Sequence, residues 1–288
     1  MTNNRLHSTL FFLCLSCLAA CQTRPIITDS PNPELITITK TDSQALVKVD
    51  VVPIGLERLL QAYPGQFVGA DPNSLMWLDG TKMRYDDGKD HKSFAQLLND
   101  ADLEDQVMAM PYKKGYKFLA PQQKEDPGRV RYEPFFKKMY GNTAEEVRSK
   151  LTTIIWLPKS MGIKLQVTTV NGIDKKIQEI SNRLDTMPQF HKYLQNPGGT
   201  FVWRKIAGTD RLSMHSFGMT IDINVAYSDY WRWVHKVDDE NGTLNIPYKN
   251  RIPMELVQIF EEYGFIWGGK WYHYDTMHFE YRPELLID

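Results

Sequence analysis

The sequence predicts an α+β fold in which antiparallel strands near the C-terminus carry polar side chains on one face and helices cover the other. Apolar residues occupy every second position from Met219 to Val225, which is the period of a half-buried strand. Met277, Phe279 and Tyr281 repeat this alternation. Isoleucines and leucines at helical spacing between residues 173 and 187 predict an amphipathic helix.

The composition is that of an ordinary globular protein. The chain has 288 residues, of which 42% are hydrophobic and 24% charged, so it is long enough for one large or two modest domains. The formal net charge of -1 gives no reason to expect a nucleic-acid partner.

The first residues are typical of an export signal. A polar opening precedes an apolar run over residues 10–20, which is too short to span a membrane. We therefore expect residues 1–20 to be removed as a signal peptide. Leu-Ala-Ala-Cys21 resembles a bacterial lipoprotein box, which implies a lipid on Cys21, a membrane anchor and a periplasmic location. Gln22 after it resembles an outer-membrane sorting signal if the source is Gram-negative. The alternative is a plain secretory signal in which Cys21 is incidental.

Two regions are expected before the C-terminal domain. Residues 21–44 are rich in Thr, Pro, Asp and Asn without a regular period, which predicts a tether. Residues 45–142 are expected to form a smaller α+β lobe. Its predicted elements are a helix over residues 56–63, two strands joined by a turn at Asp79-Gly80, and a helix capped by Ser93.

We assign residues 143–288 to the second domain. A capping-box pattern starts at Thr143, and apolar residues at helical spacing predict a helix that reaches Ile155. Strands are predicted over residues 163–169 and 200–207. A further helix should follow Pro253 and end at Gly264.

The candidate site combines two stretches near the C-terminus. His215 precedes the first strand, and Gly218 allows a turn that aims its imidazole toward Asp222. His278 lies on the outward face of the second strand. Two neutral imidazoles and one carboxylate leave one tetrahedral position open, as in catalytic zinc sites. Asp275, three residues before His278, is placed to take a proton from water activated there, which predicts a hydrolase.

These stretches resemble the zinc D,D-peptidases of the M15 type, which include D-alanyl-D-alanine carboxypeptidases and L-alanyl-D-glutamate peptidases. The family pattern is Ser-x-His-x-x-Gly-x-x-x-Asp followed by an acid three residues before a histidine, and it is matched by Ser213, His215, Gly218, Asp222, Asp275 and His278. The resemblance covers roughly the last 140 residues, one domain's length. It implies a hedgehog/DD-peptidase-like antiparallel sheet with helices, a Zn²⁺ cofactor and a peptidoglycan stem peptide as substrate. Thr220 departs from the Ala of many relatives.

Further residues have alternative interpretations. The resemblance places Arg204 near the substrate, where it would stabilise an oxyanion or bind a terminal carboxylate, although it would also fit as a surface arginine. Ser213 either contacts substrate or holds a turn, and Trp271 either walls the cleft or packs in the core. Asp275 would alternatively orient an imidazole. Glu280 is expected behind the metal ligands rather than among them.

The interpretation that we favour is a lipid-anchored zinc D-alanyl-D-alanine carboxypeptidase. The alternatives are an endopeptidase of the same family and a non-catalytic wall-binding protein with a structural zinc. A carboxypeptidase needs a site closed around a terminal carboxylate, whereas an endopeptidase needs an open cleft. The polar segment over residues 226–250 is expected at the cleft rim, and its sequence does not distinguish the two shapes.

Overall fold

The computed structural model describes residues 51–236, 239–240 and 242–288. The predicted signal peptide, the tether and Cys21 lie outside these residues. The described residues all belong to one compact unit. Among the described residues, no helix has both the length and the apolar character needed to cross a membrane.

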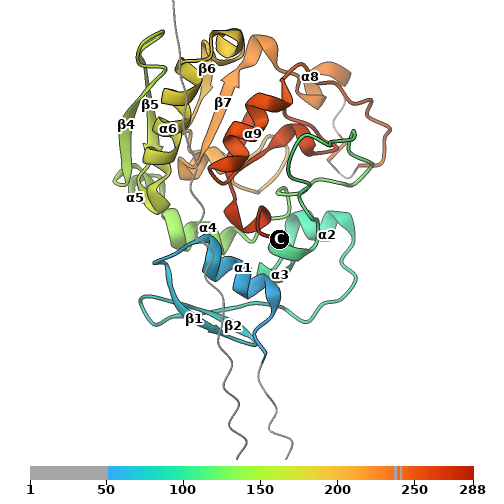
Figure 1. Cartoon of the computed structure of the whole chain (residues 1–288). Coiled ribbons are helices and arrows are strands. Elements are labelled where there is room, and N and C mark those ends of the chain that lie inside the picture. The colour runs from blue at the N-terminus through green and yellow to red at the C-terminus, as the bar shows by residue number, and fades with distance from the viewer. Residues whose placement is uncertain (1–50, 237–238, 241) are drawn as a thin grey trace, which may run out of the picture. The chain divides into compact units, whose positions relative to one another are not determined.

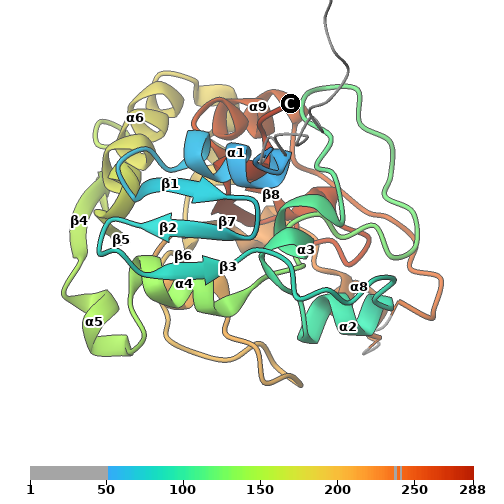
Figure 2. The same cartoon turned by 90° about the horizontal axis from the view of Figure 1, so that it is seen from below.

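The N-terminal part contains the small α+β arrangement that the sequence predicts. Helix α1 (Ile54–Ala62) is followed by an antiparallel sheet of β1 (Phe67–Asp71), β2 (Ser74–Trp77) and β3 (Lys82–Arg84), seen from below in Figure 2. Helices α2 (Phe94–Asn99) and α3 (Leu103–Met108) come next. Ser93 caps α2 through a capping box with Gln96, as its position indicated.

A two-stranded hairpin replaces the predicted helix over residues 143–155. Thr143 caps only the short helix α5 (Ala144–Arg148), and β4 (Leu151–Trp156) then pairs antiparallel with β5 (Ile163–Thr168). Helix α6 (Ile173–Asp185) packs on β4. The prediction was wrong because the apolar and β-branched residues of β4 also fit a strand, and pairing with β5 decides between the two.

The sheet that carries the site is antiparallel, in the order β6-β7-β9-β8. Its strands are β6 (Pro197–Gly199), β7 (Thr220–Asn224), β8 (Phe265–Trp267) and β9 (His278–Tyr281), and α9 (Met254–Glu262) packs on β8 (Figure 1). The predicted strand over residues 200–207 is wrong. There the chain makes only an isolated bridge between Lys205 and Leu212.

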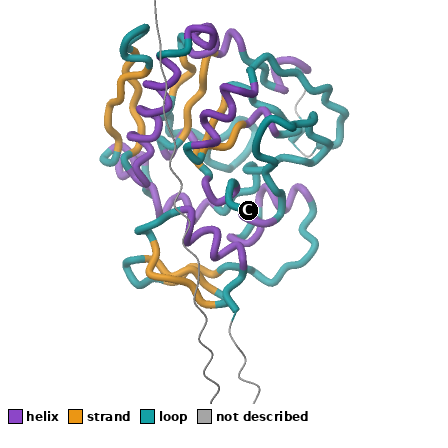
Figure 3. The backbone as a smooth tube through the Cα atoms, in the orientation of Figure 1, coloured by secondary structure: helices purple, strands orange, loops and turns teal. Residues whose placement is uncertain are grey.

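The other elements are short. The remaining α-helices are α4 (Glu133–Tyr140), α7 (His191–Leu194) and α8 (Trp231–His235), and 3-10 helices span Val170–Gly172, Pro188–Phe190, Met214–Phe217, Val225–Tyr227, Gly268–Lys270 and Pro283–Leu285. Residues 109–132 hold no helix or strand, and they appear as a long loop in Figure 3. This loop supplies Asp126, Arg129 and Arg131 to the region of the site.

One apolar core runs through the described unit. It contains Leu56 of α1, Phe135 of α4 and Phe260 of α9 among many others. The Tyr63 hydroxyl also donates a 2.6 Å hydrogen bond to Glu284, which lies 221 positions away. The N-terminal elements therefore pack against the C-terminal part of the chain, while the domain boundary near residue 143 stays a prediction.

Candidate metal centre

Strands β7 and β9 bring the predicted ligands together. Their register pairs Asp222 with His278, and a 3-10 turn before β7 carries His215. His215 Nε2 lies 3.1 Å and His278 Nδ1 3.0 Å from the same oxygen of Asp222. Gly218 has φ +65°, and a Cβ there would lie 2.7 Å from Leu151 Cδ2, so the turn that places His215 requires glycine.

The imidazole of His215 is oriented by groups behind it. Its Nδ1 lies 3.0 Å from the carbonyl oxygen of Thr200 and 2.9 Å from the hydroxyl of Thr220. A carbonyl only accepts, so Nδ1 carries the hydrogen and the lone pair of Nε2 faces Asp222. Thr220, the departure from the family pattern, thus contributes to the position of a ligand.

The imidazole of His278 is oriented by a carboxylate instead. Its Nε2 lies 3.0 Å from Glu280, which Arg131 and Arg282 bind at 2.8 and 3.1 Å. Burial would raise the pKa of Glu280, but Arg131, His278 and Arg282 outweigh it and lower the pKa to about 2. Glu280 is therefore ionised and accepts the Nε2 hydrogen, which leaves the lone pair of His278 Nδ1 at the cluster. Glu280 lies behind the ligand, as expected.

The donors fit a metal cation. One ligand atom each from His215, Asp222 and His278 lies within 4.8 Å of the others. Burial opposes the charged form of His278, yet hydrogen bonds with Asp222 and Glu280 raise its pKa to about 10. The negative charge that favours a proton on this imidazole would also favour a metal ion in the place of that proton. Two imidazoles with one carboxylate are typical zinc ligands.

Asp275 lies beside the cluster without being one of its three donors. Its Oδ1 is buried and has no hydrogen-bond partner among the described residues. Burial and the nearby charge of Asp222 raise the pKa of Asp275 to about 7. A buried acceptor without a partner costs about 1–3 kcal/mol. This oxygen is therefore suited to receive a proton from a molecule bound in the cavity.

A cavity of about 450 Å³ opens onto the cluster and Asp275. Arg204, Ser213 and Trp271, the residues predicted to contact substrate, all line it. Arg204 is exposed at the edge, Ser213 is buried, and the Trp271 ring lies 5.5 Å from that of His278. Trp267 instead packs inside the core on Phe279, so it is not a cavity wall.

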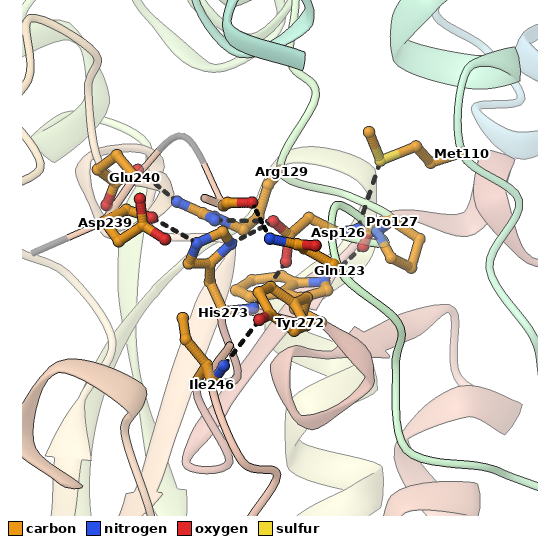
Figure 4. A network of polar contacts seen from close by, with 12 residues as sticks. Met110, Gln123, Asp126, Pro127, Arg129, Asp239, Glu240, Ile246, Tyr272 and His273 are labelled. Carbon is orange, nitrogen blue, oxygen red and sulfur yellow. Dashed lines mark hydrogen bonds and ion pairs between the residues drawn. The ribbon is translucent and has the colours of Figure 1, made fainter. Parts of the chain in front are cut away.

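Two arginines of the long loop also belong to the site, although no sequence motif indicated them. Arg129 and Arg131 are both largely buried and line the cavity. Arg129 pairs with Asp126 and Glu240, and Asp126 also binds His273 (Figure 4). The partners lie up to 149 positions away in the chain, so no local pattern indicates these contacts.

The comparisons agree with the motif. Residues 207–281 match the model of the D-alanyl-D-alanine carboxypeptidase family, a segment that contains the three candidate ligands and Asp275. No curated protein and no solved structure matches the chain. The match supports the M15-type peptidase family for this segment of the chain.

Proposed function

We propose that the protein is a zinc-dependent peptidase that hydrolyses peptidoglycan stem peptides as a D-alanyl-D-alanine carboxypeptidase. The observation that carries the proposal is the arrangement, in one cavity, of three zinc-type donors and a buried carboxyl oxygen that has no hydrogen-bond partner among the described residues. The match of residues 207–281 to a peptidase family supports the reaction class. A structural zinc site would not need the additional carboxyl group.

His215, Asp222 and His278 would hold the zinc ion. When bound, zinc supplies Lewis acidity toward the scissile carbonyl and lowers the pKa of water at the site. Asp275 Oδ1 takes a proton from the attacking water and then donates it to the leaving amine. A pKa of about 7 suits a group that must both accept and donate.

The substrate contacts would come from the edge of the cavity. Arg204 is exposed there, and among the described residues its guanidinium contacts only the carbonyl of Lys205, at 3.4 Å. It is therefore available for a terminal carboxylate or a developing oxyanion. Ser213 lies next to it, because its backbone nitrogen donates to the carbonyl of Arg204.

The location is part of the same proposal. A lipid on Cys21 would tether the enzyme in the periplasm, close to its substrate, with the inner leaflet of the outer membrane as the site in a Gram-negative source. Mass spectrometry of the exported protein tests this directly. Cys21→Ser should remove the mass of the lipid and release the protein from membranes, whereas an unmodified N-terminus in the parent chain would contradict the anchor.

Turnover is tested with muropeptides that end in D-alanyl-D-alanine. The zinc-loaded protein should release D-alanine, chelation should stop the release, and added zinc should restore it. Asp275→Asn should lower kcat by about 10²- to 10⁴-fold at unchanged zinc content. Glu145→Gln, which changes an exposed carboxyl on α5, serves as the matched control.

The products distinguish the alternatives. Mass spectrometry that finds cleavage inside the stem peptide, with no free D-alanine, would identify an endopeptidase. Zinc-loaded protein that binds sacculi without cutting any stem peptide would identify a wall-binding protein instead.

A further inference from the structure

The backbone places Tyr230 directly opposite Asp275. The two residues form an isolated antiparallel bridge. Backbone hydrogen bonds join the residues on either side of this pair: Trp231 N with Tyr274 O at 3.0 Å, and Thr276 N with Asp229 O at 2.9 Å. In a pair that is flanked in this way the Cα atoms are only about 4.5 Å apart, and both side chains lie on the same face. The ring of Tyr230 therefore lies beside the carboxyl of Asp275.

Neighbouring contacts hold Tyr230 in this position. Asp229 N donates a 2.7 Å hydrogen bond to the hydroxyl of Thr276, and the Asp229 carboxylate binds Arg251 at 3.0 Å. The ring of Tyr230 packs edge-on against that of Trp233, with 5.2 Å between the ring centres. Tyr230 is half-buried and lines the cavity that contains the cluster and Asp275. A group that is held in place before the substrate arrives can stabilise a transition state without reorganisation.

The hydroxyl of Tyr230 has no hydrogen-bond partner among the described residues. Three other tyrosines of the same apolar cluster each have one: Tyr248 binds the carbonyl of Gly269, Tyr272 that of Leu244, and Tyr274 the imidazole of His235. Burial and the nearby charge of Asp275 raise the pKa of Tyr230 to about 12, so the phenol keeps its proton at neutral pH. Tyr230 is therefore a hydrogen-bond donor that faces the cavity and still lacks an acceptor.

We propose that Tyr230 is a further catalytic residue, whose hydroxyl donates a hydrogen bond to the oxygen of the scissile carbonyl as that oxygen becomes negatively charged. The proposal rests on the peptidase function proposed above. Water adds to the carbonyl carbon while Asp275 accepts its proton, and the electron pair of the C=O double bond moves to the oxygen. The phenol stabilises this charge and keeps its own proton. The pair then re-forms the double bond, the C–N bond breaks, and Asp275 protonates the leaving amine.

This role separates Tyr230 from Arg204. Arg204 is exposed at the edge of the cavity, whereas Tyr230 is opposite the residue that moves the proton. A donor to an oxygen that becomes charged only in the transition state raises kcat. A contact that the bound substrate and the transition state share, such as one to a terminal carboxylate, lowers KM instead. The two residues should therefore differ in which kinetic constant they control.

Tyr230→Phe in the full, zinc-loaded chain tests the proposal, because it removes the hydroxyl and retains the ring. The kcat for hydrolysis should fall by about 10- to 100-fold, while KM and zinc content stay within about twofold. Calorimetry with a phosphinate analogue of the scissile dipeptide gives a second measure, since its tetrahedral anion replaces the reacting carbonyl. Its affinity should fall by the same factor. The uncleaved peptide, measured in an Asp275→Asn background, should bind equally with and without the hydroxyl.

Tyr227→Phe is the matched control for Tyr230→Phe. Tyr227 lies three positions earlier and is also half-buried, but its ring packs against Tyr193 and it is not among the residues that line the cavity. Its loss of a hydroxyl should change neither kcat nor the affinity for the phosphinate. Arg204→Gln provides the contrast, because it should weaken the uncleaved peptide and the phosphinate by the same factor.

Each outcome decides the proposal. Unchanged kcat in Tyr230→Phe would overturn it, as would a lower kcat with unchanged affinity for the phosphinate, because the hydroxyl would then act elsewhere than on the charged oxygen. A rise in KM alone would make Tyr230 a substrate contact and also overturn it. A parent chain that hydrolyses no stem peptide would reject the peptidase function, and the phosphinate would then decide on Tyr230 alone. A parent chain that also fails to bind the phosphinate would reject both.

Discussion

Two buried histidines of this protein have nearly the same surroundings and different tasks. His278 binds the carboxylate of Glu280, which is paired with Arg131, and His273 binds the carboxylate of Asp126, which is paired with Arg129. The two histidines differ in the partner of their second ring nitrogen. In His278 it faces Asp222 at the cluster, whereas in His273 it lies 2.7 Å from the carbonyl oxygen of Asp239 (Figure 4).

This difference explains why only one of the two is suited to hold a metal. A carbonyl oxygen accepts a hydrogen bond, so His273 Nε2 carries a hydrogen and has no lone pair to offer. The group around His273 instead connects the long loop to the segment after α8, because Asp126 and Asp239 lie on these two segments. The surroundings of a histidine therefore indicate its task only when the partners of both nitrogens are known.

Glu280→Gln should have the largest effect, because it should lower both the affinity for zinc and the stability of the fold. Gln retains the size of the side chain but loses the charge that pairs with Arg131 and Arg282. We expect zinc affinity to fall by about 10- to 100-fold. The free energy of unfolding should fall by about 3–5 kcal/mol, because two buried guanidinium groups lose a partner. Competition with a chromophoric chelator and urea unfolding measure the two quantities.

Glu262→Gln is the matched control for Glu280→Gln. Glu262 also pairs with an arginine, Arg183, but both side chains are about half exposed. Exposed pairs contribute about 0–1 kcal/mol, so neither quantity should change measurably. Unchanged zinc affinity in Glu280→Gln would mean that the carboxylate does not orient His278.

Asp126→Asn should affect the fold and leave the metal site unchanged. Asp126 is fully buried, and the substitution leaves Arg129 with Glu240 as its only carboxylate partner among the described residues. We expect the free energy of unfolding to fall by about 3 kcal/mol at neutral pH. Zinc affinity should stay within a factor of about three, because His273 contributes no lone pair. A tenfold loss of zinc affinity would contradict the distinction between the two histidines.

The stability lost in Asp126→Asn should depend on pH. Burial would raise the pKa of Asp126, but Arg129 and the hydrogen bond with His273 outweigh it and hold this pKa below its usual value. A lowered pKa stabilises the fold above the value in the unfolded chain, about 3.9, and the stabilisation is lost as pH falls toward the folded value. The difference in unfolding free energy between the parent chain and Asp126→Asn should therefore shrink below about pH 4. Urea unfolding between pH 6 and 3 measures it.

The sequence predicted that the candidate ligands lie together, but it did not predict their surroundings, and the reason is physical. Alternation along a strand determines which side chains share a face, so His278 and Glu280 were correctly placed on one side of β9. The burial of Arg131 depends on contact with Glu280, 149 positions away, and no local pattern encodes such a contact. The same limit applies to β4, because its partner β5 decides that it is a strand rather than a helix.

Tyr63→Phe should have the smallest effect on stability and zinc affinity. It tests whether residues of the N-terminal part help to position His278. The Tyr63 hydroxyl donates to Glu284, which binds Arg282, which in turn binds Glu280. The substitution removes one hydrogen bond and should lower the free energy of unfolding by about 1–2 kcal/mol.

Zinc affinity should change less than about twofold in Tyr63→Phe, because Arg131 still holds Glu280 in place. Tyr116→Phe, at an exposed position, controls for the loss of a hydroxyl. A loss of zinc affinity as large as that of Glu280→Gln would mean that the whole chain of bonds from α1, rather than Arg131 and Glu280 alone, positions the ligand. The metal site would then depend on the N-terminal elements as strongly as on its own sheet.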